Sequence, residues 1–115
     1  MANIFPFINP LLHSELRLKM MVALDSLESA EFMYLCRITE CTRGNLSVQI
    51  KILSEAGYLE VTKIGFGHLS RTVCRITPKG HEALHAYEEG LRQLFSQEIP
   101  TQEDYNTNQN NLLCK

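Results

Sequence analysis

Apolar residues recur at helical spacing in the first third of the chain, and they predict two helices. Asn9 followed by Pro10 is a typical helix start, because Asn caps the first turn and Pro lacks only an amide that would be unpaired there. Apolar side chains then return every three or four positions, so one helix is expected over residues 10–27. A short second helix is expected over residues 32–39, FMYLCRIT.

The stretch TRGNLSVQIKILSEAGYLEV, which begins at Thr42, predicts a third helix that leads directly into a strand. Thr42 is a good N-cap, since its hydroxyl can accept a hydrogen bond from an amide of the first helical turn. Leu46, Ile50 and Leu53 fall on one helix face. Gly57 stands where a left-handed residue is expected to end the helix.

After this third helix the pattern changes from helical to alternating. YLEVTKI and RTVCRIT each alternate like a strand, and the glycine-containing segment GFGHLS between them is typical of a turn, so a hairpin is expected. Thr77 and Pro78 start another helix, whose apolar stripe continues to about residue 97. Residues 98–115 are rich in Asn, Gln and Thr, which predicts a polar, disordered tail.

These elements predict one mostly helical domain of the α+β class, residues 1–97, with a small β-hairpin. A chain of 115 residues with 44% hydrophobic content suits a single core. Three helices, a two-stranded hairpin with a basic glycine loop and a long closing helix form a winged helix-turn-helix. In that arrangement the third helix enters the DNA major groove and the hairpin, or wing, lies along the backbone or minor groove.

The distribution of charge favours a polyanion as the partner. The net charge is −2, yet residues 37–79 carry seven Lys and Arg against three Glu, while the segments on either side are acidic. A basic middle between acidic ends suits a polyanion-binding face. No apolar run reaches the roughly 18 residues of a membrane helix, and no signal peptide is evident. We therefore expect a cytoplasmic protein whose four cysteines are reduced.

The outward face of the third helix supplies the candidate contacts to DNA. A face that combines Gly, Asn and Ser is a poor choice for an ordinary solvated helix on propensity alone. Contacts to base edges are expected from Ser47 and Lys51, and a contact to a thymine methyl from Val48. Phosphate contacts are expected at the start of the helix, where amide dipoles favour an anion, from Arg43, Gly44 and Asn45.

Basic residues on both strands of the hairpin and in its turn are suited to phosphate contact, and these are Lys63, His68 and Arg71. The alternative for all three is an ordinary solvated hairpin. Gln49 could hydrogen-bond a base, but its position flanks the buried face of the third helix.

The segments HSELRLKMMVAL, TRGNLSVQIKILSEAGYLEV and RTVCRITPKGHEALHAYEEGL together resemble the small MarR/ArsR-like winged-helix transcriptional regulators. The type most similar is the compact winged helix DNA-binding domain, over about residues 10–96. The resemblance implies a prokaryotic transcription regulator that binds double-stranded DNA as a homodimer. The expected DNA site is an inverted-repeat operator. It also implies a dimer interface built from the first and last helices. The wing departs from the pattern, because GFGHLSRT lacks the arginines and proline of many relatives.

Two histidines offer a metal-responsive alternative within the same resemblance. His81 and His85 lie one helical turn apart in HEALHAYE, with Glu88 on the same face. The zinc site on the last helix of ArsR-like sensors needs a carboxylate two residues before the first His, where this chain has Lys79. Their cysteine site needs CxC, whereas YLCRITEC spaces its cysteines five apart. Neither pattern is complete, so we expect no metal and no cofactor.

Other classes of function receive less support. The chain has no paired-carboxylate motif, phosphate loop or nucleophile motif of an enzyme, so no catalytic residue is expected. Cys36 beside Arg37 could be a redox switch, although a small buried apolar residue is the more common role. A winged-helix protein-interaction module would tend to have an apolar or acidic third helix, whereas this one is neutral to basic.

Apolar residues near both ends of the helical region predict a homodimer interface. The first helix carries apolar residues beyond one stripe, and the preceding IFPFI is too apolar for a free tail. A domain of fewer than about 100 ordered residues has too small a core to bury two faces of one helix. A two-fold axis here would set two third helices roughly 34 Å apart, one DNA turn. The expected interface residues are Phe5, Phe7, Leu12, Leu16, Leu91, Leu94 and Phe95.

Overall fold

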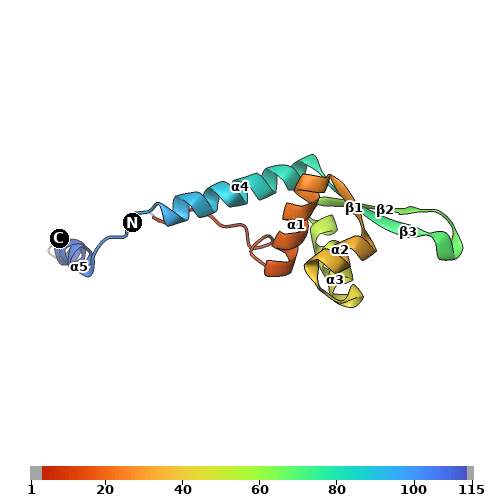
Figure 1. Ribbon diagram of the computed structural model, residues 1–115. Helices are drawn as coiled ribbons and strands as arrows, with labels where there is room; N and C mark the ends of the chain where they lie inside the picture. The colour runs from red at the N-terminus through yellow and green to blue at the C-terminus, as the bar shows by residue number, and fades with distance from the viewer. Residues whose placement is uncertain (1–3, 114–115) are drawn as a thin grey trace.

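The chain forms a body of short helices and a small sheet, from which a long helix leads away (Figure 1). The computed structural model describes residues 4–113, and the side chains of residues 4–107. The elements follow one another as α1 (Glu15–Leu27), β1 (Ser29–Glu31), α2 (Phe32–Thr39), α3 (Arg43–Glu55), β2 (Leu59–Ile64), the 3-10 turn η1 (Gly67–Leu69), β3 (Arg71–Ile76), α4 (Pro78–Phe95) and α5 (Gln102–Leu113). The molecule is elongated, at 74 × 26 × 21 Å.

The sheet has three antiparallel strands in the order β1-β3-β2, one strand more than the sequence predicts. The additional strand, β1, is only three residues long and pairs Ser29 with Arg75. Three residues are too few to show an alternating pattern, so this strand cannot be predicted from the sequence. The hairpin of β2 and β3 extends past β1 as the wing (Figure 1).

The core of the body lies between α1, α2, α3 and the base of the sheet. Its fully buried side chains are mostly leucines and methionines, namely Leu12, Met20, Met21, Leu24, Leu35, Leu46, Leu53 and Cys74. The predicted boundaries of α3 are confirmed, because the Thr42 hydroxyl accepts a hydrogen bond from the Asn45 amide at 3.1 Å. Gly57 follows this helix at a φ of +82°, the left-handed conformation predicted for it.

The first helix begins five residues later than the sequence predicts. Asn9 caps a separate turn, in which its side-chain oxygen accepts from the Leu11 amide at 3.0 Å and its carbonyl accepts from the amides of Leu12 and His13. The Asn9 amide group also donates to the Tyr58 hydroxyl at 2.9 Å. The Asn9-Pro10 pair therefore anchors a turn against the body, and α1 starts after Ser14.

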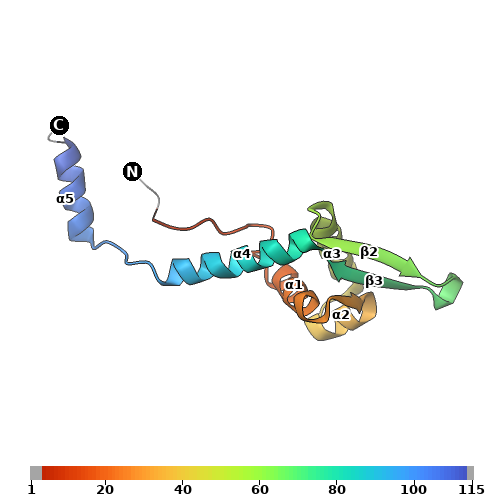
Figure 2. The same ribbon diagram turned by 90° about the horizontal axis from the view of Figure 1, so that it is seen from above.

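The segment before α1 lies along α4, as Figure 2 shows for the red trace beside the blue-green helix. His13 Nδ1 lies 3.0 Å from the Tyr87 hydroxyl on α4. Further along the same helix, a Cβ on Gly90 would stand 3.1 Å from the carbonyl oxygen of Phe7. Glycine at this position therefore allows the two backbones to approach closely, which offsets the cost of glycine within a helix.

The tail is helical over Gln102–Leu113, which corrects the prediction of a segment without regular structure. Its start carries a reciprocal cap, since the Asp104 amide donates to the Thr101 hydroxyl at 3.2 Å and the Thr101 amide donates to the Asp104 carboxylate at 3.3 Å. The prediction of disorder rests on the amino-acid composition of the tail, which does not reveal this cap. Cys114 lies outside the described residues. Among the helices described, none is long and apolar enough to cross a bilayer.

Replacing Gly80 by alanine is expected to lower the free energy of unfolding by about 1–3 kcal/mol, the usual cost of overpacking. A Cβ on Gly80 would overlap the backbone carbonyl oxygen of Tyr58, and because a Cβ is fixed by its own backbone, no side-chain rotation can relieve the overlap. Urea denaturation followed by circular dichroism measures the loss. Gly44→Ala is the matched control, because its Cβ would meet nothing within 4 Å. Equal stabilities for the two variants would contradict the prediction.

Candidate nucleic-acid interface

The outward face of α3 is fully available to a partner in this structure. Leu46, Ile50 and Leu53 turn inward, so the residues between them point to solvent. The six predicted contact residues on this helix are all exposed, namely Arg43, Gly44, Asn45, Ser47, Val48 and Lys51. Val48 stands out among them as an apolar side chain that is 55% exposed. The helix thus presents one apolar group among polar and basic groups.

A chain of side-chain hydrogen bonds connects α3 to α1. The Gln49 amide group donates to the Asn45 side-chain oxygen at 3.1 Å, and the Gln49 oxygen accepts from Arg17 Nη1 at 2.6 Å. Arg17 is held in turn, because its Nε donates to the Leu11 carbonyl at 2.6 Å. Gln49 therefore links α3 to α1, and this chain of bonds uses the side-chain oxygen of Asn45 but not its amide hydrogens. The sequence carries no local signal for Arg17, because its partner is 32 residues away.

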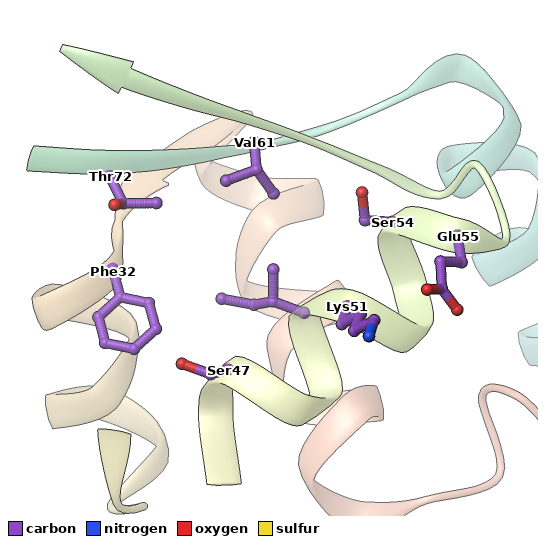
Figure 3. Close-up of a pocket in the computed structure, with 8 residues that line it drawn as sticks. Phe32, Ser47, Lys51, Ser54, Glu55, Val61 and Thr72 are labelled. Carbon is purple, nitrogen blue, oxygen red and sulfur yellow. The ribbon is translucent and has the colours of Figure 1, made fainter. Parts of the chain in front are cut away.

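A groove of about 390 Å³ separates α3 from the wing. Ser47 and Lys51 line it from the helix, and Val61 and Thr72 line it from strands β2 and β3. Figure 3 shows Phe32 of α2 at one side of this groove, near Ser47 and Thr72. The helix and the wing are thus two walls of one concave surface. Phe32, Val61 and Thr72 are parts of this surface that the sequence did not single out.

The three wing residues predicted to contact phosphates are all exposed, and one of them forms an ion pair within the chain. Lys63, His68 and Arg71 are exposed. Arg71 Nη1 lies 2.8 Å from a carboxylate oxygen of Glu31, and both side chains are about half exposed. An exposed ion pair contributes only about 0.2–1 kcal/mol, so a phosphate can replace Glu31 as the partner of Arg71 at little cost.

The tip of the wing is more apolar than a phosphate-binding loop requires. Phe66 is 93% exposed and Leu69 is 75% exposed. Gly65 and Gly67 on either side of Phe66 adopt positive φ, so the backbone turns sharply around that ring. Two exposed apolar side chains at the end of a hairpin can contact sugars or bases in a groove.

The described cysteines are buried or partly buried, and burial makes two of their thiols hard to ionise. Burial raises the pKa of the Cys74 thiol to about 11. The pKa of Cys36 is also raised, chiefly by burial and further by the neighbouring Cys41. Because the thiolate is the reactive form, these values favour the buried apolar role for Cys36 over a redox switch.

The residues predicted to form a dimer interface fall into three groups. Leu12 is wholly buried inside the protomer, which corrects its assignment, because it has no surface left for a partner. Leu16, Leu91 and Leu94 are partly buried. The three phenylalanines remain accessible, with Phe5 49%, Phe7 81% and Phe95 86% exposed.

A helix-turn-helix whose second helix exposes its outward face, followed by an antiparallel wing that shares a groove with it, defines a winged-helix protein. The chain belongs to the winged helix DNA-binding domain family, which matches residues 16–95. The predicted fold class and the predicted resemblance to winged-helix transcriptional regulators are confirmed.

Three individual proteins are similar to this chain in sequence or in structure. An uncharacterised protein of Methanocaldococcus jannaschii is 35% identical over 82 residues, which cover 71% of this chain and 89% of that protein. A transcriptional regulator homologue of Pyrococcus horikoshii has a similar structure, with 27% identity, a TM-score of 0.69 and coverage of 74% of this chain and 84% of that one. The transcriptional regulator BldR of Sulfolobus solfataricus shares the fold at 22% identity and a TM-score of 0.61, with coverage of 88% and 73%.

Proposed function

We propose that this protein is a transcriptional regulator that binds specific DNA sequences as a homodimer and catalyses no reaction. The observation that carries the proposal is the concave surface formed by α3 and the wing. Polar and basic residues of α3 and of the wing strands stand exposed around this surface, with Glu55 as the acidic residue of its lining, within a protein whose net charge is −2. A polyanion is the partner that this arrangement suits best. Such a regulator acts in the prokaryotic cytoplasm, where the chromosome lies.

The proposed docking places α3 in the major groove and the wing on the adjacent backbone. A helix fits the width of the major groove, where each base pair presents its own pattern of donors and acceptors. Ser47 and Lys51 would then contact base edges, with Val48 against a thymine methyl. Arg43, Gly44 and Asn45 would meet phosphates at the helix start, where the helix dipole favours an anion.

The proposed dimer uses the end of the molecule that lies away from the wing. The N-terminal segment and the last turn of α4 lie side by side there (Figure 2), and they expose Phe7 and Phe95. Rings this exposed are unfavourable in water unless another surface covers them. A second copy of the chain, placed by a two-fold axis, would cover them and present two α3 helices to one face of DNA.

Selecting bound sequences from a random pool of duplex DNA tests the proposal. An inverted repeat, with half-sites about 10–10.5 base pairs apart centre to centre, is the expected result for a symmetric dimer. The affinity for that sequence is expected to fall steeply with salt, because phosphate neutralisation releases counterions. A pool that stays random, or an affinity independent of salt, would support a protein-interaction module in place of a DNA-binding regulator.

A further inference from the structure

A cluster of three side chains lies outside the concave surface, where α1 meets α4. His81 and His85 stand one turn apart on α4, and their rings are 4.2 Å apart, centroid to centroid. Both rings face the carboxylate of Asp25 on α1, with His81 Nδ1 at 2.5 Å from one oxygen and His85 Nε2 at 3.2 Å from the other. Helix α1 thus supplies a carboxylate that the sequence of α4 lacks at position 79.

The ligand atoms are close enough together to bind one metal ion. One atom from each of the three side chains lies within 4.8 Å of the other two. A tetrahedral zinc ion with bonds of about 2.0–2.2 Å separates its ligand atoms by roughly 3.3–3.6 Å. Rotations of exposed histidine side chains can reach that spacing, since the His81 and His85 side chains are 56% and 51% exposed.

Two charged side chains of α4 lie beside the cluster. His85 Nδ1 faces a Glu88 carboxylate oxygen at 3.8 Å, and the other Glu88 oxygen lies 2.7 Å from Arg92 Nη2. Histidines that bind a metal through one ring nitrogen usually direct the other nitrogen to a carboxylate, which fixes the ring orientation. Asp25 also belongs to the last turn of α1, the end at which the helix dipole favours a cation.

We propose that Asp25, His81 and His85 of one protomer form a binding site for a single Zn²⁺ ion, with water completing its coordination. Two imidazoles and one carboxylate are ligands suited to zinc. This set lies within one chain and joins α1 to α4, so it differs from both ArsR-like patterns that the sequence fails to match. The ion would hold the two helices together, and it is expected to raise Tm. The proposal is independent of DNA binding.

Titration of the full-length, metal-free, reduced protein with Co²⁺ tests the site, because bound Co²⁺ has visible d–d absorption. The expected result is one Co²⁺ per protomer, displaced by Zn²⁺. Asp25→Asn and the double variant His81→Ala/His85→Ala are each expected to weaken binding at least about tenfold. Circular dichroism of the metal-free variants verifies that they fold.

Two control variants and the spectrum itself distinguish the proposed ligands from others. His68→Ala removes an exposed histidine on the wing, and Glu82→Gln removes a carboxylate on α4 outside the cluster, so both are expected to bind Co²⁺ like the wild type. An absence of Co²⁺ uptake would overturn the proposal. So would unchanged binding by the double variant, or the near-ultraviolet charge-transfer absorption of a cysteine thiolate bound to Co²⁺.

Discussion

Phe95→Glu is expected to dissociate the proposed homodimer into monomers and to weaken binding to a full operator by about 100-fold or more. The ring is 86% exposed in the protomer, so a charge there leaves the fold intact. In a two-fold dimer each substitution acts twice, and each removes the burial of an aromatic side chain, a contribution of about 1.5–3 kcal/mol. Binding through one half-site then replaces binding through two.

Sedimentation at micromolar concentration measures the first effect, and titration of operator DNA measures the second. Phe66→Glu is the matched control for sedimentation, because Phe66 is 93% exposed but lies on the wing. This variant is expected to remain a dimer. A wild-type protein that sediments as a monomer and still binds the full operator tightly would contradict the proposed interface.

Lys51→Ala and Ser47→Ala are expected to relax base preference at particular operator positions by about 1–3 kcal/mol each. Arg71→Ala is expected to weaken binding to every sequence by a similar factor, and to reduce the slope of log affinity against log salt by about 1. The difference arises because base edges carry sequence information whereas phosphates do not. Titrations of the operator and of its single-base variants measure both effects.

Lys19→Ala is the matched control for Arg71→Ala. Both basic side chains are exposed and paired with a glutamate, at 2.9 Å for Lys19 and 2.8 Å for Arg71, but Lys19 lies on α1. Its loss is expected to leave DNA affinity unchanged. Equal losses on all sequences for Ser47→Ala, Lys51→Ala and Arg71→Ala would mean that the base-reading face lies elsewhere.

Elements with strong local signals could be predicted from the sequence. The second helix, residues 32–39, has the predicted boundaries, and the cap at Thr42 and the left-handed Gly57 were both foreseen. The missed elements depend on weaker or more distant signals. Strand β1 exists only because β3 pairs with it, and α5 begins at a two-residue cap within a segment whose composition suggests disorder.

The candidate sites show the same limit, because local periodicity does not reveal tertiary partners. Exposure of the α3 residues follows from the helical period, and the sequence predicted it correctly. Leu12 is predicted at the interface because the first helix carries apolar residues beyond one stripe, and only the packed body shows that Leu12 is buried within the protomer. Asp25 lies 56 residues before His81, and no spacing rule connects the two.

The hydrogen bonds that run from Arg17 through Gln49 to Asn45 bear on any attempt to transplant the proposed DNA-binding surface onto another protein. Asn45 and Gln49, grafted from α3 onto another winged helix, would arrive without the arginine of α1 that holds Gln49. Such a graft is expected to keep the proposed phosphate contact of Asn45 only when an arginine equivalent to Arg17, with its Leu11 carbonyl partner, is transferred as well. The unit to transfer is therefore a pair of helices.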